Sequence, residues 1–190
     1  MKSPFPSSLV ASPRGDRVAW VSNDQGKRNV WVADGPDYTA RKITAYSEDD
    51  GLEISGLAFS ADGELVFFVR GGNINSQGEY PNPSSNPRGT SQEVWAIRIA
   101  NRELLRIGEG ANPVPSPAGG RMVFILRGQI QLAEAKDNFK PHPLFKARGT
   151  CRDLVWSPDG TTLAFVSTRQ GHSFIGIYDL AKAALRWVAP

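Results

Sequence analysis

A four-residue turn that begins with serine and ends with glycine recurs four times in this 190-residue chain. It constrains the fold more than any other feature. The clearest copy is Ser157-Pro-Asp-Gly160, which separates two apolar stretches at 154–157 and 162–167. Proline presets φ for a turn, aspartate can hydrogen-bond to its own backbone, and glycine accepts a positive φ. We therefore expect a tight turn that joins two strands into a β-hairpin.

The other three copies are Ser12-Pro-Arg-Gly15, Ser60-Ala-Asp-Gly63 and Ser116-Pro-Ala-Gly119. Measured between the serines, the spacings are 48, 56 and 41 residues, and the middle one is long because of an insertion at 71–92. A period of roughly 40–45 residues that consists only of strand patterns is typical of β-propeller blades. The turn is thus the marker of a repeated blade.

Each repeat offers four short apolar segments, and no segment of useful length shows helical periodicity. The expected fold class is all-β: a β-propeller of four consecutive four-stranded antiparallel blades in one module over residues 1–190. The blades span approximately 5–45, 53–108, 111–146 and 150–189. Four blades are either a partial propeller or half of an eight-bladed ring.

The composition, with 40% hydrophobic and 22% charged residues, is typical of a globular chain that buries one sizeable core. The net charge is +3, but the basic residues are spread among acids, so we expect no nucleic-acid partner. The single cysteine, Cys151, excludes an internal disulfide and a cysteine-built metal cluster, and we expect it in the core.

No stretch approaches the ~20 apolar residues of a membrane helix. The N-terminus also lacks the apolar region of a signal peptide. The location therefore stays open: periplasmic or secreted if a signal peptide has been removed, and otherwise cytoplasmic.

Three long connections should lie at the end of the blades opposite the serine–glycine turns: 45–53, 71–92 and 169–173. Loops on a rigid scaffold commonly carry binding sites. The candidate substrate-binding residues there are Glu48, Asp49, Asp50, Glu79, Tyr80 and His172. Each also has a purely structural interpretation: the insertion as a tolerated surface loop, the acids as a solvated turn, and His172 as a hydrogen-bonded strand end.

The sequence lacks the common catalytic and cofactor motifs. Gly171–Gly176 resembles a nucleophile elbow but has the wrong spacing, and the chain has two histidines, so a serine-hydrolase triad is not expected. Phosphate-binding, dinucleotide-binding and metal motifs are also missing. We therefore expect no catalytic residue, metal or cofactor in this chain.

Several stretches resemble the N-terminal propeller of bacterial serine peptidases of the prolyl oligopeptidase and dipeptidyl peptidase IV family. They are 157–167, followed by 172–179, and in the first half 5–13, 29–33, 48–51 and 69–72 with the Asn/Pro-rich insertion. The resemblance spans essentially the whole chain. The serine–glycine repeat by itself is shared with TolB-like propellers.

The resemblance implies a propeller of seven or eight blades that caps a C-terminal α/β-hydrolase domain and filters peptide access. It also implies, in some members, that paired glutamates bind the substrate amine. This chain has four blades, no hydrolase domain and no adjacent Glu-Glu pair. The expected function is therefore a non-catalytic module that gates or recognises peptides for a hydrolase domain absent from this chain. The alternative is a free-standing TolB-like propeller that binds a protein partner.

Both faces of a blade are apolar because each packs on a neighbour, so the first and fourth blades each need a cover. The four blades could close on themselves, two chains could join, or further blades of a longer protein could supply the cover. Among these we expect a homodimer, in which the first blade of each chain packs on the fourth blade of the other.

Overall fold

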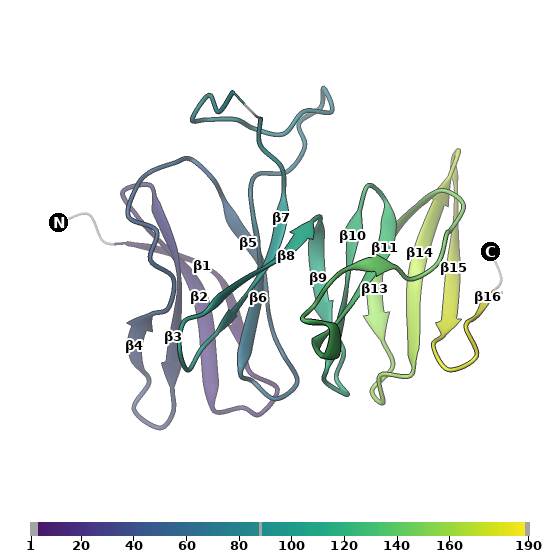
Figure 1. Cartoon of the computed structure of the whole chain (residues 1–190), viewed down its shortest axis with the longest axis horizontal. Coiled ribbons are helices and arrows are strands. Elements are labelled where there is room, and N and C mark those ends of the chain that lie inside the picture. Colours follow the sequence, from purple (N-terminus) through teal and green to yellow (C-terminus); the bar gives the residue numbers. More distant parts are fainter. Residues whose placement is uncertain (1–3, 88, 189–190) are drawn as a thin grey trace. The chain divides into compact units, whose positions relative to one another are not determined.

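The computed structural model describes residues 4–87 and 89–188, which form four antiparallel sheets of four strands each (Figure 1). Sheet 1 contains β1 (Phe5–Ala11), β2 (Arg17–Asp24), β3 (Lys27–Asp34) and β4 (Thr39–Lys42). Sheet 2 contains β5 (Ile54–Phe59), β6 (Leu65–Arg70), β7 (Glu93–Arg98) and β8 (Leu104–Glu109). Sheet 3 contains β9 (Ala111–Pro115), β10 (Arg121–Leu126), β11 (Gln129–Glu134) and β12 (His142–Pro143). Sheet 4 contains β13 (Thr150–Trp156), β14 (Thr162–Arg169), β15 (His172–Asp179) and β16 (Ala184–Val188).

In every sheet the strands lie in the order of the sequence, so each sheet is a simple up-and-down meander. Within the described residues the one helical element is a three-residue 3-10 turn, η1 (Ala135–Asp137). The prediction of an all-β chain built from four four-stranded antiparallel blades is confirmed. In the same described part of the chain, no helix has the length and apolar character needed to cross a membrane.

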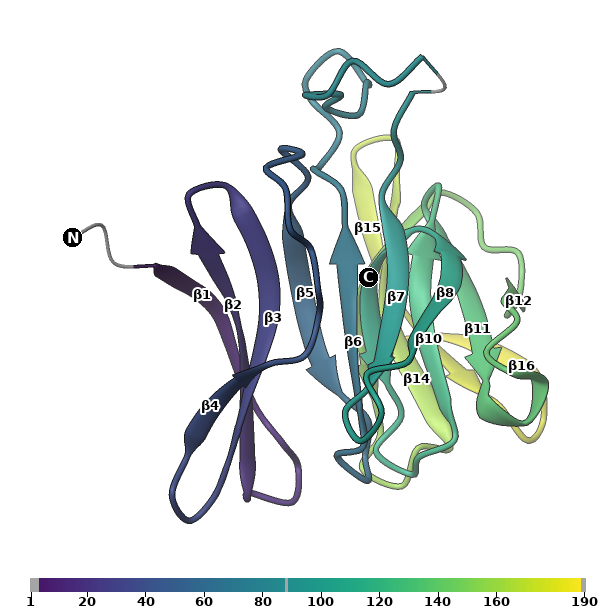
Figure 2. The same cartoon turned by 60° about the vertical axis from the view of Figure 1, so that its left-hand side comes forward.

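The chain divides into two compact units, the first ending at Ala111 and the second beginning at Asn112. In unit 1, sheets 1 and 2 pack face to face (Figure 2). Alternation along the strands sends Ala19 and Val21 of β2 into this core, where they meet Val66 and Phe68 of β6. Unit 1 therefore has its own hydrophobic core.

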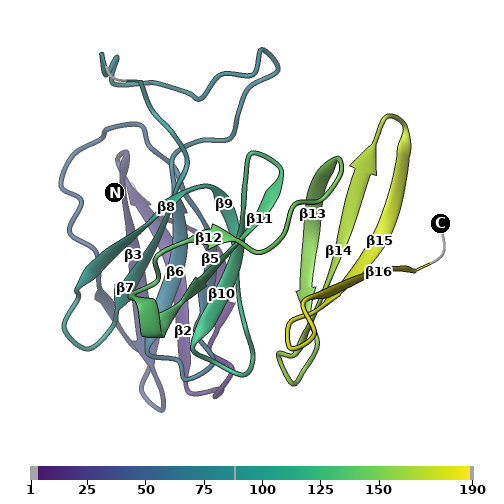
Figure 3. The ribbon, with the colours of Figure 1, turned by 45° about the vertical axis from the view of Figure 1, so that its right-hand side comes forward.

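In unit 2, sheet 4 packs on sheet 3 (Figure 3). The core contains Val123 of β10 together with Leu163 and Phe165 of β14. Trp156 also lies there, and its indole Nε1 donates a hydrogen bond to the Val114 carbonyl at 3.0 Å. Cys151 is buried as expected, and burial raises the pKa of its thiol.

The four serine–glycine turns share one geometry. In each, the glycine N–H donates to the serine carbonyl, at 2.8, 2.9, 3.0 and 2.8 Å in chain order, and the glycine has a positive φ between 67° and 78°. In the last turn, Asp159 accepts hydrogen bonds from the Ser157 hydroxyl at 2.6 Å and the Thr161 N–H at 3.0 Å. These bonds lower the pKa of Asp159 to about 2.

A second repeated feature escaped the sequence reasoning. Four residues before each marker serine, the first strand of every blade contains a residue with positive φ: Ser8, Gly56, Asn112 and Asp153. In the three blades whose first pairing is recorded, the strand register shifts at this point, as in a β-bulge. The bulge interrupts the alternation of side chains between the two faces of the sheet. The apolar pattern therefore reveals only the part of each first strand that follows the bulge, and the strand itself begins earlier.

Candidate functional site

The candidate site is the end of unit 1 that lies opposite its serine–glycine turns, called here the long-loop end. It consists of the β2–β3 turn (24–27), the loop 43–53 and the insertion 71–92 (Figure 1). The turn 60–63 enters β6 at one end and the insertion leaves β6 at the other, which confirms the predicted strand direction.

The loop 43–53 is fixed where it leaves sheet 1. The buried Asn29 side chain accepts hydrogen bonds from the Thr44 hydroxyl and from the Tyr46 N–H, both at 2.9 Å. Its amide nitrogen donates to the Tyr46 carbonyl, also at 2.9 Å. The Thr44 hydroxyl in turn accepts from the Val30 N–H. One buried amide therefore holds both Thr44 and Tyr46 at the start of the loop.

Two of the predicted acids in this loop are paired with arginines. Asp50 forms an ion pair and hydrogen bond with Arg70 at the end of β6. The Arg70 guanidinium also lies over the Tyr46 ring, 3.6 Å from its centroid. Burial raises the pKa of Tyr46 above its usual 10.0, although Arg70 acts in the opposite direction. Asp50, Arg70 and Tyr46 thus form one contact cluster.

Asp49 lies at the β2–β3 turn, with its Oδ1 3.7 Å from Arg28. Gly26 contacts the Asp49 side chain so closely that a Cβ at this glycine would lie 2.0 Å from Asp49 Cγ. Glu48, the remaining acid of the triplet, is exposed. The three acids are therefore not equivalent: Asp50 is half-buried against Arg70, Asp49 is exposed but lies beside Arg28 and Gly26, and Glu48 is exposed.

The insertion is built around two asparagines that close short turns. Asn75 Oδ1 accepts from the backbone N–H groups of Gln77 and Glu79, at 2.9 and 3.0 Å. Asn82 exchanges two hydrogen bonds with the backbone of Asn86, at 2.8 and 2.9 Å. Glu79 is exposed and Tyr80 is half-buried. Side chain to backbone bonds of this kind give a loop a defined shape.

The insertion contacts the acidic loop. A Cβ on Gly51, which has φ +68°, would lie 2.5 Å from the Cβ and Cγ atoms of Pro83. Together with the Gly26–Asp49 contact, this joins three segments that lie far apart in the sequence. Unit 1 thus brings together Glu48, Asp49 and Asp50 with the loop that carries Glu79 and Tyr80.

A cavity of about 410 Å³ opens beside these loops, between sheets 1 and 2. Arg28 and Glu53 place opposite charges on its wall, and Phe5 and the bulge residue Ser8 line it from β1. Sequence reasoning missed this cavity because its walls come from four separate strands.

The bulge did have a signal in the sequence. Four positions before each marker serine lies a residue that adopts a positive φ: Ser8, Gly56, Asn112 and Asp153.

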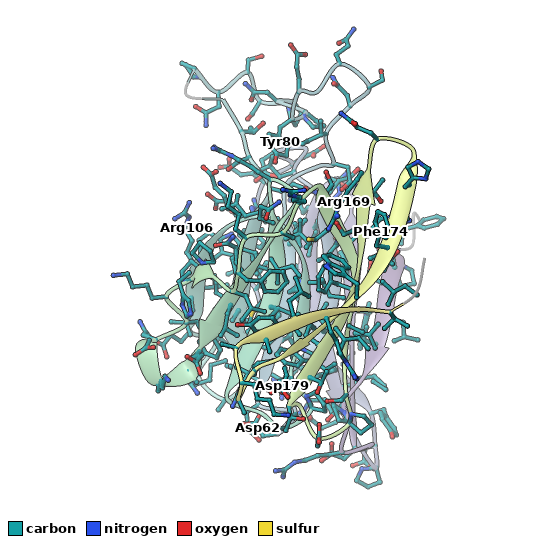
Figure 4. All side chains as sticks on the ribbon, turned by 90° about the vertical axis from the view of Figure 1, so that its right-hand side faces the viewer. Asp62, Tyr80, Arg106, Arg169, Phe174 and Asp179 are labelled. Carbon is teal, nitrogen blue, oxygen red and sulfur yellow. The ribbon has the colours of Figure 1, made fainter. Side chains whose placement is uncertain are left out.

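His172 lies in unit 2, so its grouping with the acids of unit 1 stays a prediction. It is the exposed first residue of β15 and pairs with Arg169 of β14, at the end of sheet 4 opposite the turn 157–160. Arg169 lies over the Phe174 ring, 4.9 Å from its centroid (Figure 4). It also lies 4.6 Å from the centroid of the Trp187 ring. Over the described residues, no group of three or more His, Cys, Asp or Glu side chains is arranged to hold a metal ion.

No protein-family model matches this chain. An uncharacterized protein of Agrobacterium fabrum is 22% identical over 192 residues, which cover 83% of this chain and 60% of that protein. The Tol-Pal system protein TolB of Bordetella pertussis is 33% identical over 100 residues, which cover 50% of this chain and 22% of that protein. The chain therefore spans less than two thirds of the length of each relative.

Solved structures match over nearly the whole chain. TolB from Acinetobacter baumannii has a TM-score of 0.67 at 20% identity, covering 98% of this chain and 44% of that one. A prolyl endopeptidase has a TM-score of 0.70 at 13% identity, covering 97% of this chain and 29% of that one. Both known groups whose repeats resemble this sequence thus share its fold, and the chain has a TolB-like propeller fold.

Proposed function

We propose that this chain is a binding module that recognises a peptide or protein segment at the long-loop end of unit 1. The observation that carries the proposal is the fixed arrangement of three loops, held by Arg28–Asp49, Arg70–Asp50 and the contact of Gly51 with Pro83. A surface that is already ordered loses little conformational freedom when a partner binds.

The charges at this end favour a basic partner. Arg28 and Arg70 balance Asp49 and Asp50, which leaves Glu48, Glu53 and Glu79 as exposed acids around the cavity and the insertion. A peptide that carries lysines or a free amino terminus matches this pattern. Exposed charges of this kind act mainly on the association rate and depend on salt. The half-buried Tyr80 adds an aromatic surface beside them.

Sequence similarity favours a TolB-like interaction propeller, because 100 residues of this chain match TolB of Bordetella pertussis at 33% identity. The second candidate is the propeller domain of a prolyl oligopeptidase-family peptidase. It rests on the resemblance of the Asn/Pro-rich insertion and of the stretch 48–51. Reading the gene beyond the codon for Pro190 separates the two: an in-frame hydrolase region with a Gly-x-Ser-x-Gly motif supports the peptidase, and a stop codon supports the interaction propeller.

The binding test uses a short alanine–lysine peptide with a free amino terminus and a fluorescent label, followed by fluorescence polarisation. The double variant Glu48→Gln/Glu79→Gln should weaken binding by about threefold to tenfold, as expected for exposed charge pairs. Glu64→Gln is the matched control, because Glu64 is an exposed acid at the opposite end of sheet 2. If the peptide does not bind, or if the control weakens binding equally, this site assignment is wrong.

A further inference from the structure

The cavity between sheets 1 and 2 carries two opposite charges that do not pair with each other. Arg28 of β3 and Glu53, the residue before β5, both line it. Arg28 lies beside Asp49 instead, and within residues 4–87 and 89–188 the Glu53 carboxylate has no ion-pair partner. A separate cation and anion on one cavity wall are complementary to a ligand that itself carries both charges.

The positive side of the cavity is held in position and still has donors to offer. Arg28 Nη1 donates to the Gly26 carbonyl at 3.0 Å, and Asp49 Oδ1 lies 3.7 Å from it, beyond hydrogen-bond distance. The Nε and Nη2 groups therefore remain donors. Asn23 pairs with Arg28 across the sheet and also lines the cavity. Its Oδ1 accepts from the Gly26 N–H at 2.8 Å, which leaves its amide nitrogen as a further donor. Donors of these two kinds, side by side, suit a carboxylate.

The negative side is fixed by the backbone of β5 and its neighbours. The Glu53 carbonyl accepts from the Gly71 N–H at 2.9 Å, whereas the carboxylate stays exposed. Ser55, Ser7 and Ser8 add polar groups to the wall. Two successive residues of β1 can both lie there because the strand register shifts between Ser7 and Val10. A carboxylate with hydroxyl groups nearby suits an ammonium group, whose three N–H donors need acceptors.

The rest of the wall is apolar, and the cavity is small. Val21 and Ile54, which are buried, and Phe5, which is exposed, supply this part. Phe5 and Val21 lie on the same face of sheet 1 as Asn23, because Phe5 pairs with Asn23 and Ser7 with Val21. The volume of about 410 Å³ lies within the range of roughly 300–1,000 Å³ that is usual for small-molecule sites. The cavity therefore suits a small ligand with one apolar side chain.

We propose that this cavity binds a free zwitterion of the amino-acid class, either a single amino acid or a dipeptide. Its carboxylate lies at Arg28 and Asn23, its ammonium group at Glu53, and its apolar side chain against Val21 and Ile54. An internal segment of a longer peptide has neither charge on its backbone, so the cavity selects molecules whose two ends are both free. The site goes beyond the peptide recognition proposed above and does not depend on it, because the wall of the cavity makes all the contacts.

Isothermal titration calorimetry with leucine and with alanyl-leucine tests the proposal. At least one of them should bind, and the tighter of the two identifies the ligand size. The same ligands are then measured with the amine acetylated or the carboxylate amidated. Each blocked form should bind about tenfold to a hundredfold more weakly, as expected when a charge-assisted hydrogen bond is lost.

Two variants assign the two ends of the ligand. Glu53→Gln should remove the preference for the free amine over the acetylated form, and Arg28→Gln should remove the preference for the acid over the amide. Circular dichroism checks that both are folded, and Glu53→Gln decides alone if Arg28→Gln is not. Glu64→Gln is the control, because Glu64 is an exposed acid at the opposite end of sheet 2, and it should bind as the wild type does.

Three results would overturn the assignment. They are no binding of either ligand, blocked forms that bind as tightly as the free ones, and a Glu53→Gln variant that still prefers the free amine. Failure of the labelled alanine–lysine peptide to bind would count against the recognition surface alone, so the two proposals are judged separately.

Discussion

Gly176 in β15 offers a direct test of how the blades of unit 2 are packed. It pairs across the sheet with Phe165 of β14, whose ring lies over it. A Cβ at this position would lie 2.4 Å from Phe165 Cζ and 2.6 Å from Cε1. Since Phe165 is buried against Phe145, with ring centroids 5.3 Å apart, its ring has little room to move. The substitution Gly176→Ala should therefore overpack the core.

The expected cost of Gly176→Ala is about 2 kcal/mol, in the range for inserting one methyl group into a packed core. Phe165→Ala should cost about 3–5 kcal/mol through lost burial and the cavity that remains. In the double variant the alanine at 176 no longer meets a ring, so the second substitution should add almost nothing. The two sites should therefore be coupled by about 2 kcal/mol.

Urea unfolding of the four proteins measures this coupling, with hydrogen exchange of β14 and β15 to localise the effect to unit 2. Local exchange is needed because two compact units need not unfold in one transition. If Gly176→Ala is neutral, or if the two costs simply add, the ring of Phe165 does not cover Gly176 and the packing of sheet 4 is wrong.

Three further outcomes are expected. The pKa of Asp159 is about 2 in the fold against its usual 3.8, so the ionised carboxylate should stabilise the fold above pH 4, and this stabilisation should be lost as the pH falls toward 2. In urea unfolding at several pH values, Asp159→Asn should make the free energy of unfolding less dependent on pH over this range. Arg70→Gln should raise the pKa of Tyr46 further, because the guanidinium favours the tyrosinate, and an ultraviolet titration that finds a lower value would contradict this. Gly51→Ala should separate the insertion from the acidic loop, because φ is positive and Pro83 occupies the space; faster proteolysis within 71–92 is the readout, and unchanged cleavage would refute the contact.

The turn residues explain why the fold could be predicted from the sequence. A serine carbonyl and a glycine N–H three residues later close each turn, and local residue types determine that geometry. The strand order followed, because consecutive hairpins leave a meander as the simplest pairing. The bulges at Ser8 and Asp153 were missed because an αL residue inside a strand interrupts the period-2 alternation, and only the comparison of all four repeats reveals it.

The candidate site was predictable only in outline. Loop lengths located the long-loop end, but the partners of the acids come from distant strands: Arg28 lies 21 residues before Asp49, and Arg70 lies 20 residues after Asp50. Only the tertiary fold determines which arginine pairs with which aspartate. For the same reason, the sequence could not show that Asp49 and Asp50 each lie beside an arginine, Arg28 and Arg70.

The long-loop end of unit 1 is the recognition surface that we propose. Hydrogen exchange of the chain, with and without a saturating amount of the alanine–lysine peptide, tests it most directly because it maps the contact on the native protein. If the peptide binds at this end, exchange should become slower in 43–53 and 71–92 and stay unchanged in the turns 12–15 and 60–63. Protection confined to those turns, or spread over unit 2 alone, would contradict it.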